Sequence, residues 1–274
     1  MTAAATTDLT ARSDPERTTS QMRIFSDTWL MFRRSLGLTF RQPAWLIAGV
    51  VQPFVYLLLF GPLLNSFSGM PGFPPGGAFN VFVPGLLVMT ALFGSTFVGF
   101  GFIDEMRHGV VERMRVTPMS RTATVLGRSL RDVVVFLLQG LILVVLAIPF
   151  GLTINPLGFV VAFGLLALIG LMLGPISYAM ALVIGSEDAL APLTQAIALP
   201  LLLLSGVMLP MSFAPEWLRT IASLNPLYHA TLAIRALFNA EFSSPDVITG
   251  IVTTGIFALL SIFVASRAFN RQTA

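Results

Sequence analysis

The charged residues of this chain gather in one internal segment, 101–132, with the sequence GFIDEMRHGVVERMRVTPMSRTATVLGRSLRD. Ten of these residues carry a formal charge, whereas the flanking stretches 42–103 and 133–186 carry none. Carboxylates and guanidinium groups at this density offer ion pairs, either within the chain or to a partner. The position of this segment in the fold therefore decides what its charges can contact.

The composition is that of an integral membrane protein. The chain has 274 residues, of which 55% are hydrophobic and 11% are charged, and its mean hydropathy is +0.84. A water-soluble domain has about 25% charged residues. Uncharged apolar runs of ~20 residues match helices that cross a hydrocarbon core ~30 Å thick.

Six segments are long and apolar enough to cross the bilayer as helices. They lie at about 44–65, 80–103, 133–154, 158–184, 192–211 and 247–266. A loop rich in proline and glycine joins the first two, and a turn at Asn155 and Pro156 joins the third and fourth. The sequence therefore predicts an all-α membrane protein with six transmembrane helices.

Two different parts precede the first span. Residues 1–21 are small, polar and mixed in charge, so we expect a disordered cytoplasmic tail. On a helix over 22–42, arginines fall roughly opposite an apolar face, which consists of Phe25, Trp29, Phe32, Leu36 and Phe40. This pattern is typical of an N-terminal amphipathic helix that lies in the membrane interface.

Arginine counts predict how the spans are oriented. Residues 1–42 hold six arginines, 104–132 hold six, and the C-terminal RAFNRQTA holds two. An even number of spans puts these 14 of the 16 basic residues on one side. We expect that side to be the cytoplasm, with both termini there, and the chain to be a multi-pass protein of the cell membrane.

The sequence contains no constellation that supports catalysis. It has no cysteine and no lysine, and hence no Gly-x-x-x-x-Gly-Lys loop for phosphate binding. The two histidines, His108 and His229, fall on opposite sides of the membrane in this topology and cannot share a metal ion. We expect each to be structural, and we expect no enzyme activity, cofactor or metal in this chain.

The charged segment has a helical pattern of its own. Its apolar stripe consists of Ile103, Met106, Val110 and Met114. This spacing predicts a helix in which Gly109 lies mid-helix and which Pro118 ends, while Ser120 caps a second helix that continues into the third span. Two interpretations stay open: a solvated connector that obeys the positive-inside rule, or an amphipathic docking helix across the cytoplasmic ends of two spans.

The segment 215–241 is expected on the external side. Pro215 and the pair Asn225-Pro226 are helix-start signals, and they predict two helices that are too short or too polar to cross the membrane. The pair either re-enters the membrane or rests on its outer leaflet. Arg235 either contacts the substrate or has a structural role as an ion-pair partner of Glu241. We favour the structural role.

Three stretches resemble the membrane subunits of ABC-2 type exporters, whose ATPase is a separate chain. The segment 104–132 is similar to the family's first cytoplasmic loop at Glu105, Gly109, Glu112, Arg113, 117–120 and 126–128. Residues 177–192, SYAMALVIGSEDALAP, are similar to its junction between the fourth and fifth spans. Residues 199–237 are similar to its closing signature, through Ser205-Gly206, Pro215-x-Trp217, Asn225-Pro226-Leu227 and Arg235.

The resemblance covers about 22–270, which it marks as one ABC-2 type transmembrane domain, and it is closest to the daunorubicin-resistance branch. The sequence departs from the family at Asp104-Glu105-Met106, where a more basic start is expected. The resemblance implies that two permease chains, as a homodimer, work with two ATPase chains that bind ATP and Mg. It also implies that the external pair is re-entrant.

By this resemblance the charged segment is the coupling helix, which binds in a groove of the ATPase. The residues it assigns to coupling are Asp104, Glu105, Arg107, Gly109, Glu112, Arg113 and Arg115. It further places the substrate path between two permeases, along the first, second and fifth spans. The candidate lining residues are Gln52, Tyr56, Met89, Phe93 and Gln195.

The function that follows is export of an amphiphilic, drug- or lipid-like substrate out of the cell, because the inferred path has no ring of charge. Export of a polysaccharide or glycolipid is the alternative within the family. A proton-coupled carrier or a membrane-embedded enzyme is the alternative from other classes. Acidic residues are absent from the predicted spans, which argues against a proton relay.

Overall fold

The structure, a computed structural model, describes residues 15–41, 43–67, 77–109, 121–208 and 210–271. In these residues the regular structure is helical, which confirms the predicted all-α fold class. The helices are α1 (Pro15–Phe40), α2 (Pro43–Phe67), α3 (Gly77–Arg107), α5 (Arg121–Ala147), α6 (Pro156–Ile184), α7 (Glu187–Leu204), α8 (Glu216–Ala222), α9 (Pro226–Phe238) and α10 (Pro245–Arg271). Short 3-10 turns lie at Ile148–Phe150 and Met211–Phe213.

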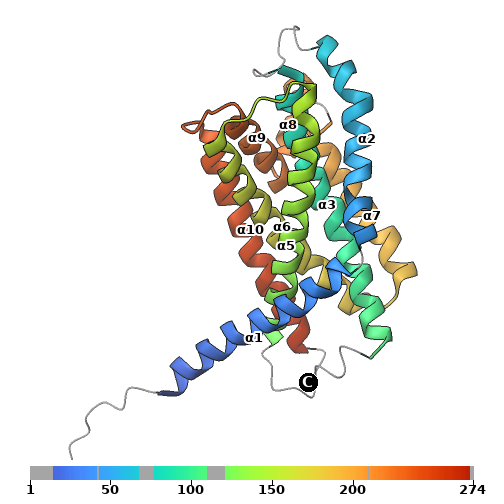
Figure 1. Ribbon diagram of the computed structural model, residues 1–274, viewed down its shortest axis with the longest axis vertical. Coiled ribbons are helices and arrows are strands. Elements are labelled where there is room, and N and C mark those ends of the chain that lie inside the picture. Colours follow the sequence, from blue (N-terminus) through green and yellow to red (C-terminus); the bar gives the residue numbers. More distant parts are fainter. Residues whose placement is uncertain (1–14, 42, 68–76, 110–120, 209, 272–274) are drawn as a thin grey trace, which may run out of the picture.

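Six of the described helices are long and apolar enough to cross a membrane, as the sequence predicted. The candidate spans are Leu46–Leu63, Gly77–Arg107, Ala123–Phe150, Pro156–Ile184, Glu187–Leu204 and Pro245–Phe269. These helices run side by side as a bundle (Figure 1). Helix α1 crosses one end of the bundle, and α9 lies toward the other (Figure 1).

The third span agrees with the predicted helix, and the fifth differs in extent from the prediction. Helix α5 begins at Arg121 and continues without a break through the third span, as expected of the helix predicted to start after Ser120. Helix α7 ends at Leu204 rather than near 211, and the chain then turns at Gly206 with a φ of 69°. Hydropathy did not predict this break, because the residues that follow it are also apolar.

The helix predicted along the apolar stripe of the charged segment is interrupted. Helix α3 ends at Arg107, and the amide of Gly109 donates to the carbonyl oxygen of Met106 at 3.0 Å. Gly109 has a φ of 67°, a left-handed conformation that commonly ends a helix. The prediction that Gly109 lies mid-helix is therefore wrong. The rest of the stripe and its expected boundaries lie outside the described residues: Val110, Met114, Pro118 and Ser120.

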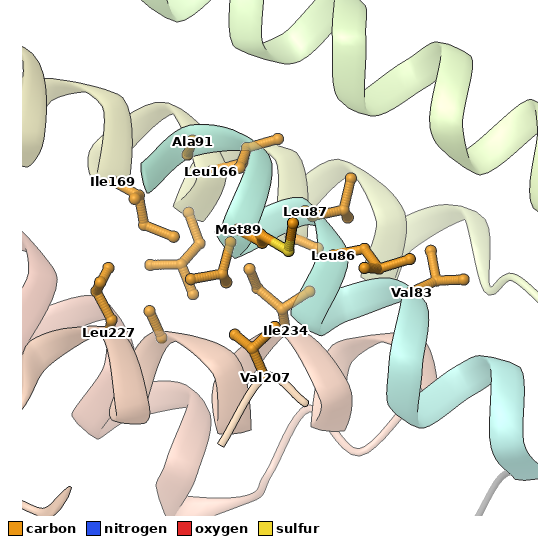
Figure 2. Packing of buried hydrophobic residues seen from close by; sticks show 14 of the residues in the cluster. Val83, Leu86, Leu87, Met89, Ala91, Leu166, Ile169, Val207, Leu227 and Ile234 are labelled. Carbon is orange, nitrogen blue, oxygen red and sulfur yellow. The ribbon is translucent and has the colours of Figure 1, made fainter. Parts of the chain in front are cut away.

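Helix α3 forms the centre of the apolar core. Its residues Val83, Leu86 and Leu87 are fully buried. Figure 2 shows α3 between Leu166 and Ile169 of α6 and Leu227 and Ile234 of α9, with Val207 of the segment after α7 packed on the same cluster. Helix α9 thus packs inside the bundle against α3, α6 and α10.

The exposed helix α8 contrasts with α9, since Trp217 on α8 is 62% exposed. Asn225 caps the start of α9 by accepting a hydrogen bond from the amide of Leu227 at 3.0 Å. Both helices begin where the sequence signals place them, after Pro215 and Asn225.

Helix α1 packs against α5 at Gly127. A Cβ atom at Gly127 would lie 2.7 Å from the Cβ of Met31 and 2.7 Å from the carbonyl oxygen of Thr28, so a larger residue cannot fit without moving α1. Met31 and Ser35 are buried on this face of α1, whereas Trp29 is 56% exposed. The chain thus fixes α1 to the bundle through one close helix contact.

We predict that Gly127→Leu displaces α1 from α5. Overpacking at such a contact costs about 1–3 kcal/mol, so α1 should open at least about fivefold more often. Limited digestion of the purified protein with trypsin, followed at Arg33 and Arg34, measures this opening. Gly37→Leu is the matched control, because nothing lies within 4 Å of a Cβ at Gly37. Equal cleavage rates in both variants would contradict the assigned contact.

Candidate coupling site

The charged segment starts at the end of α3 and continues into α5. This is the end of the bundle that α1 crosses and at which the chain finishes, and we call it the charged end (Figure 1). The described residues of the three arginine-rich parts, 15–41, 104–109 with 121–132, and 267–271, therefore lie toward one end of the bundle.

An ion pair joins α3 to α5 at the charged end. Arg128 Nη2 donates to Glu105 Oε2 at 2.5 Å, and the side chain of Arg128 is only 3% exposed. The guanidinium carbon of Arg128 also lies 4.8 Å from the centroid of the Phe102 ring. A guanidinium group that is both stacked on an aromatic ring and paired with a carboxylate has little freedom to move. The two helices that flank the segment are therefore held together.

A second polar cluster joins α5 to α1 and α6. Arg131 donates from Nη1 to Thr39 Oγ1 at 3.2 Å and from Nη2 to the Tyr178 hydroxyl at 3.0 Å. The Tyr178 hydroxyl in turn donates to Asp132 Oδ2 at 2.6 Å. Arg131 Nε lies 2.7 Å from Asp132 Oδ1, which makes an ion pair between neighbours in sequence. Three helices are thus connected through one arginine.

Two acids of these clusters lie just outside the predicted spans 80–103 and 133–154, which contain none, but inside the longer candidate spans of the structure. Glu105 lies in the candidate span Gly77–Arg107, and Asp132 lies in Ala123–Phe150. Each acid is paired with an arginine, so the four charges sum to zero close to the charged end. Removing one partner from a buried pair leaves an uncompensated charge and costs about 3–5 kcal/mol. The clusters therefore strongly favour one arrangement of the helix ends.

An exposed ion pair brings α7 to the same end. Arg107 Nη1 lies 3.2 Å from Glu187 Oε1, and both side chains are well exposed. Such pairs contribute about 0–1 kcal/mol, so this contact indicates proximity rather than strength. His108 Nδ1 lies 2.8 Å from the Asp104 carbonyl oxygen, a local contact within one helical turn. Within the described residues, no group of three or more potential ligands could hold a metal ion.

The predicted coupling residues divide into three groups. Asp104 and Arg107 are exposed at the end of α3, Glu105 is half-buried on Arg128, and Gly109 lies in the turn. The remaining candidates lie outside the described residues: Glu112, Arg113 and Arg115. The structure adds partners for which the sequence predicted no role: Thr39, Arg128, Arg131, Asp132 and Tyr178.

The candidate path residues differ in how far they are exposed. Gln52 on α2 and Gln195 on α7 are exposed, and Tyr56 and Phe93 are half-buried. Met89 is 1% exposed and lies in the core beside α9 (Figure 2). Met89 is therefore closed off in this structure, whereas the other four candidates are at least partly accessible.

Arg235 holds the opposite end of the bundle together. Its Nε donates to the Val81 carbonyl oxygen at 2.9 Å and its Nη2 to the Gly206 carbonyl oxygen at 2.7 Å, so it joins α9 to α3 and to the break after α7. The side chain is buried, and burial lowers the pKa of Arg235 to about 10, which leaves it charged at neutral pH. The structure thus supports the structural role, through carbonyl oxygens rather than Glu241.

His229 also has a local partner near that end. Its Nε2 lies 2.8 Å from the carbonyl oxygen of Ser223, in the turn between α8 and α9. This contact fits the structural role that the sequence suggested for the residue.

Comparison with known proteins matches residues 26–239 to the ABC-2 type transporter family. A transport permease designated ycf38 in Porphyra purpurea is 30% identical over 73% of this chain and 69% of its own. The Cyanophora paradoxa ycf38 permease is 27% identical over 84% of this chain and 80% of its own. The daunorubicin resistance ABC transporter permease protein DrrB1 of Streptomyces coeruleorubidus is 26% identical over 98% of this chain and 93% of its own.

We predict strong energetic coupling between Arg131 and Asp132. Asp132→Asn and Arg131→Gln should each lower the free energy of unfolding by about 3 kcal/mol, because each leaves one buried charge without its partner. The free energy of unfolding of the double variant should fall by less than the sum of the two single losses, and the difference should be at least about 1 kcal/mol. Thermal unfolding in detergent, followed by tryptophan fluorescence, measures all three.

The exposed pair Arg107 and Glu187 supplies the control for this cycle. The losses of unfolding free energy caused by Arg107→Gln and by Glu187→Gln should sum to the loss in the double variant within about 0.5 kcal/mol, because solvent screens that pair. Additive losses at Arg131 and Asp132 as well would mean that the buried cluster does not act as a unit.

Proposed function

Because this chain belongs to the ABC-2 type transporter family, we propose that it is the permease subunit of an ATP-driven exporter whose ATPase is a separate chain that binds the charged segment. ATP and Mg bind to the partner, since this sequence has no lysine and no phosphate-binding loop. The observation that carries the proposal is the set of side-chain contacts at the flanks of the charged segment: the ion pair Glu105–Arg128 joins α3 to α5, and hydrogen bonds of Arg131 join α5 to α1 and α6.

These contacts give a movement of the charged segment a route into the bundle. The pair Glu105–Arg128 keeps the ends of α3 and α5 together, so a push on the intervening loop moves both. Arg131 is hydrogen-bonded to Thr39 of α1 and to Tyr178 of α6, so a displacement of α5 also displaces these two helices. In this mechanism ATP binding closes the ATPase dimer, which pushes the loop and rearranges the two permeases.

The charged end faces the cytoplasm in this proposal, because it gathers the arginine-rich parts of the chain. Both termini then lie inside the cell. The chain offers a direct test because it has no native cysteine.

We predict that a cysteine at Ala5 is labelled by a membrane-impermeant thiol reagent only after cells are made permeable. A cysteine at Ser243, in the exposed turn between α9 and α10, should be labelled in intact cells. The fraction labelled is read from a gel shift. Labelling of the Ala5 cysteine in intact cells would reverse the topology.

A second permease, expected as a copy of this chain, covers the face that α2 and α7 leave exposed. Gln52 and Gln195 on that face are polar side chains within otherwise apolar helices, and lipid alone satisfies such groups poorly. Tyr56 and Phe93 are partly exposed. We assign the substrate path to this face, and Met89 would join it only when the core rearranges.

An amphiphilic substrate suits a path of this kind, because aromatic rings and amides line it without a ring of charge. The similarity to a permease named for daunorubicin resistance supports a drug- or lipid-like molecule. The direction that fits the family resemblance is export from the cell.

We predict that reversing two charges in the loop, Glu112→Arg with Arg113→Glu, uncouples the permease without unfolding it. Net charge stays constant, while charged contacts worth about 1–3 kcal/mol each are lost at the ATPase. The measurements are co-purification of the co-expressed ATPase and transport rate, and both should fall about tenfold or more.

Glu216→Arg with Arg219→Glu is the matched control. It reverses an exposed acid and base at the opposite end of the bundle and also preserves net charge. This variant should retain the ATPase and the parental transport rate. Full retention of ATPase and transport by the loop variant would show that Glu112 and Arg113 are not the contact.

A further inference from the structure

An open hollow lies along the exposed side of α1. Its lining residues come from that one helix: Leu30, Arg33, Arg34, Gly37, Leu38 and Arg41. The residues recur every three or four positions, so they share one side of the helix. Nothing lies within 4 Å of a Cβ placed at Gly37, so the missing side chain leaves space in the middle of the row.

The hollow faces away from the bundle. The α5 contact is made by Met31 and the buried Ser35, whereas Arg33, Arg34 and Arg41 are all exposed. None of these three arginines forms an ion pair with a residue that the structure describes. The sequence contains no acidic residue from 28 to 103, so the nearby chain supplies no carboxylate to neutralise them.

The position of α1 brings this row of charge to the membrane surface. Arg41 comes directly before α2, whose candidate span begins at Leu46. Thr39 is fixed to α5 by Arg131, close to the end of another span. The C-terminal half of α1 therefore lies at the level where the spans enter the lipid.

Apolar side chains accompany the arginines along the same side. Leu30 is 59% exposed and Leu38 is 53% exposed. Phe40 and Trp29 on the neighbouring face are also more than half exposed. An acidic protein surface would pair with the arginines but would leave these leucines uncovered, whereas a phospholipid offers a phosphate and an acyl chain together.

We propose that this hollow binds an anionic phospholipid of the leaflet in which α1 lies. Arg33, Arg34 and Arg41 donate hydrogen bonds to the headgroup phosphate, and Gly37 leaves room for it against the helix backbone. Leu30 and Leu38 contact the upper part of the acyl chains. The inference needs only that α2 crosses a membrane, so it stands whether or not an ATPase binds the charged segment.

Native mass spectrometry of the purified full chain, titrated with phosphatidylglycerol or with phosphatidylcholine, tests the proposal. Phosphatidylglycerol should bind more tightly. The variant Arg33→Gln with Arg34→Gln should raise its apparent Kd about tenfold or more, because a basic residue near an anionic surface contributes roughly a factor of five. The charge-matched control, Arg219→Gln with Arg267→Gln, should keep the parental Kd.

Steric variants separate the hollow from its net charge. Gly37→Leu fills the space, and a Cβ there meets no other atom within 4 Å. Gly164→Leu makes the same change at an exposed site of α6 whose Cβ also has no neighbour within 4 Å. Only Gly37→Leu should weaken phosphatidylglycerol binding, with unchanged thermal stability. Equal effects of the two arginine variants, equal effects of the two leucine variants, or equal affinity for both lipids would overturn the proposal.

Discussion

The cost of placing charge in hydrocarbon governs where the acids and bases of this chain lie. An unpaired charge at the centre of a bilayer costs several kcal/mol, and the stretches 42–103 and 133–186 contain none. Two acids near one end are buried wholly or in part, and each is paired with an arginine, Glu105 with Arg128 and Asp132 with Arg131. The charged end therefore combines exposed charges, such as Asp104 and Arg107, with paired charges that the helices cover.

The two ends of the bundle are held by different chemistry. At the charged end, one ion pair joins α3 to α5, and hydrogen bonds from Arg131 join α5 to α1 and α6. At the opposite end, Arg235 joins α9 to carbonyl oxygens of α3 and of the break after α7. Helix α3 takes part in both and lies in the core between them (Figure 2). A displacement that starts at Glu105 thus has a continuous helix through which to reach the Arg235 contacts.

Hydropathy and helix signals predicted the six spans and the start of α9 at Asn225, because these depend on neighbours in sequence. They also predicted the helix that starts after Ser120 and runs into the third span, but they missed the break after α7, since apolar residues continue past Gly206. The cluster of Arg131, Asp132 and Tyr178 depends on how α5 packs on α6, which no local pattern records. The sequence indicated this cluster only through Asp132, which directly precedes the third apolar span, and Tyr178, which lies within the fourth.

Photo-crosslinking in the assembled complex tests the central claim most directly. A photoreactive amino acid at Arg113, in the loop between α3 and α5, is irradiated in membranes that contain the co-expressed ATPase. The account predicts a crosslink to the ATPase chain, and none when the same amino acid replaces Glu216 at the opposite end of the bundle. Crosslinks from position 113 to lipid or to permease alone would contradict the claim that the charged segment is where the ATPase binds.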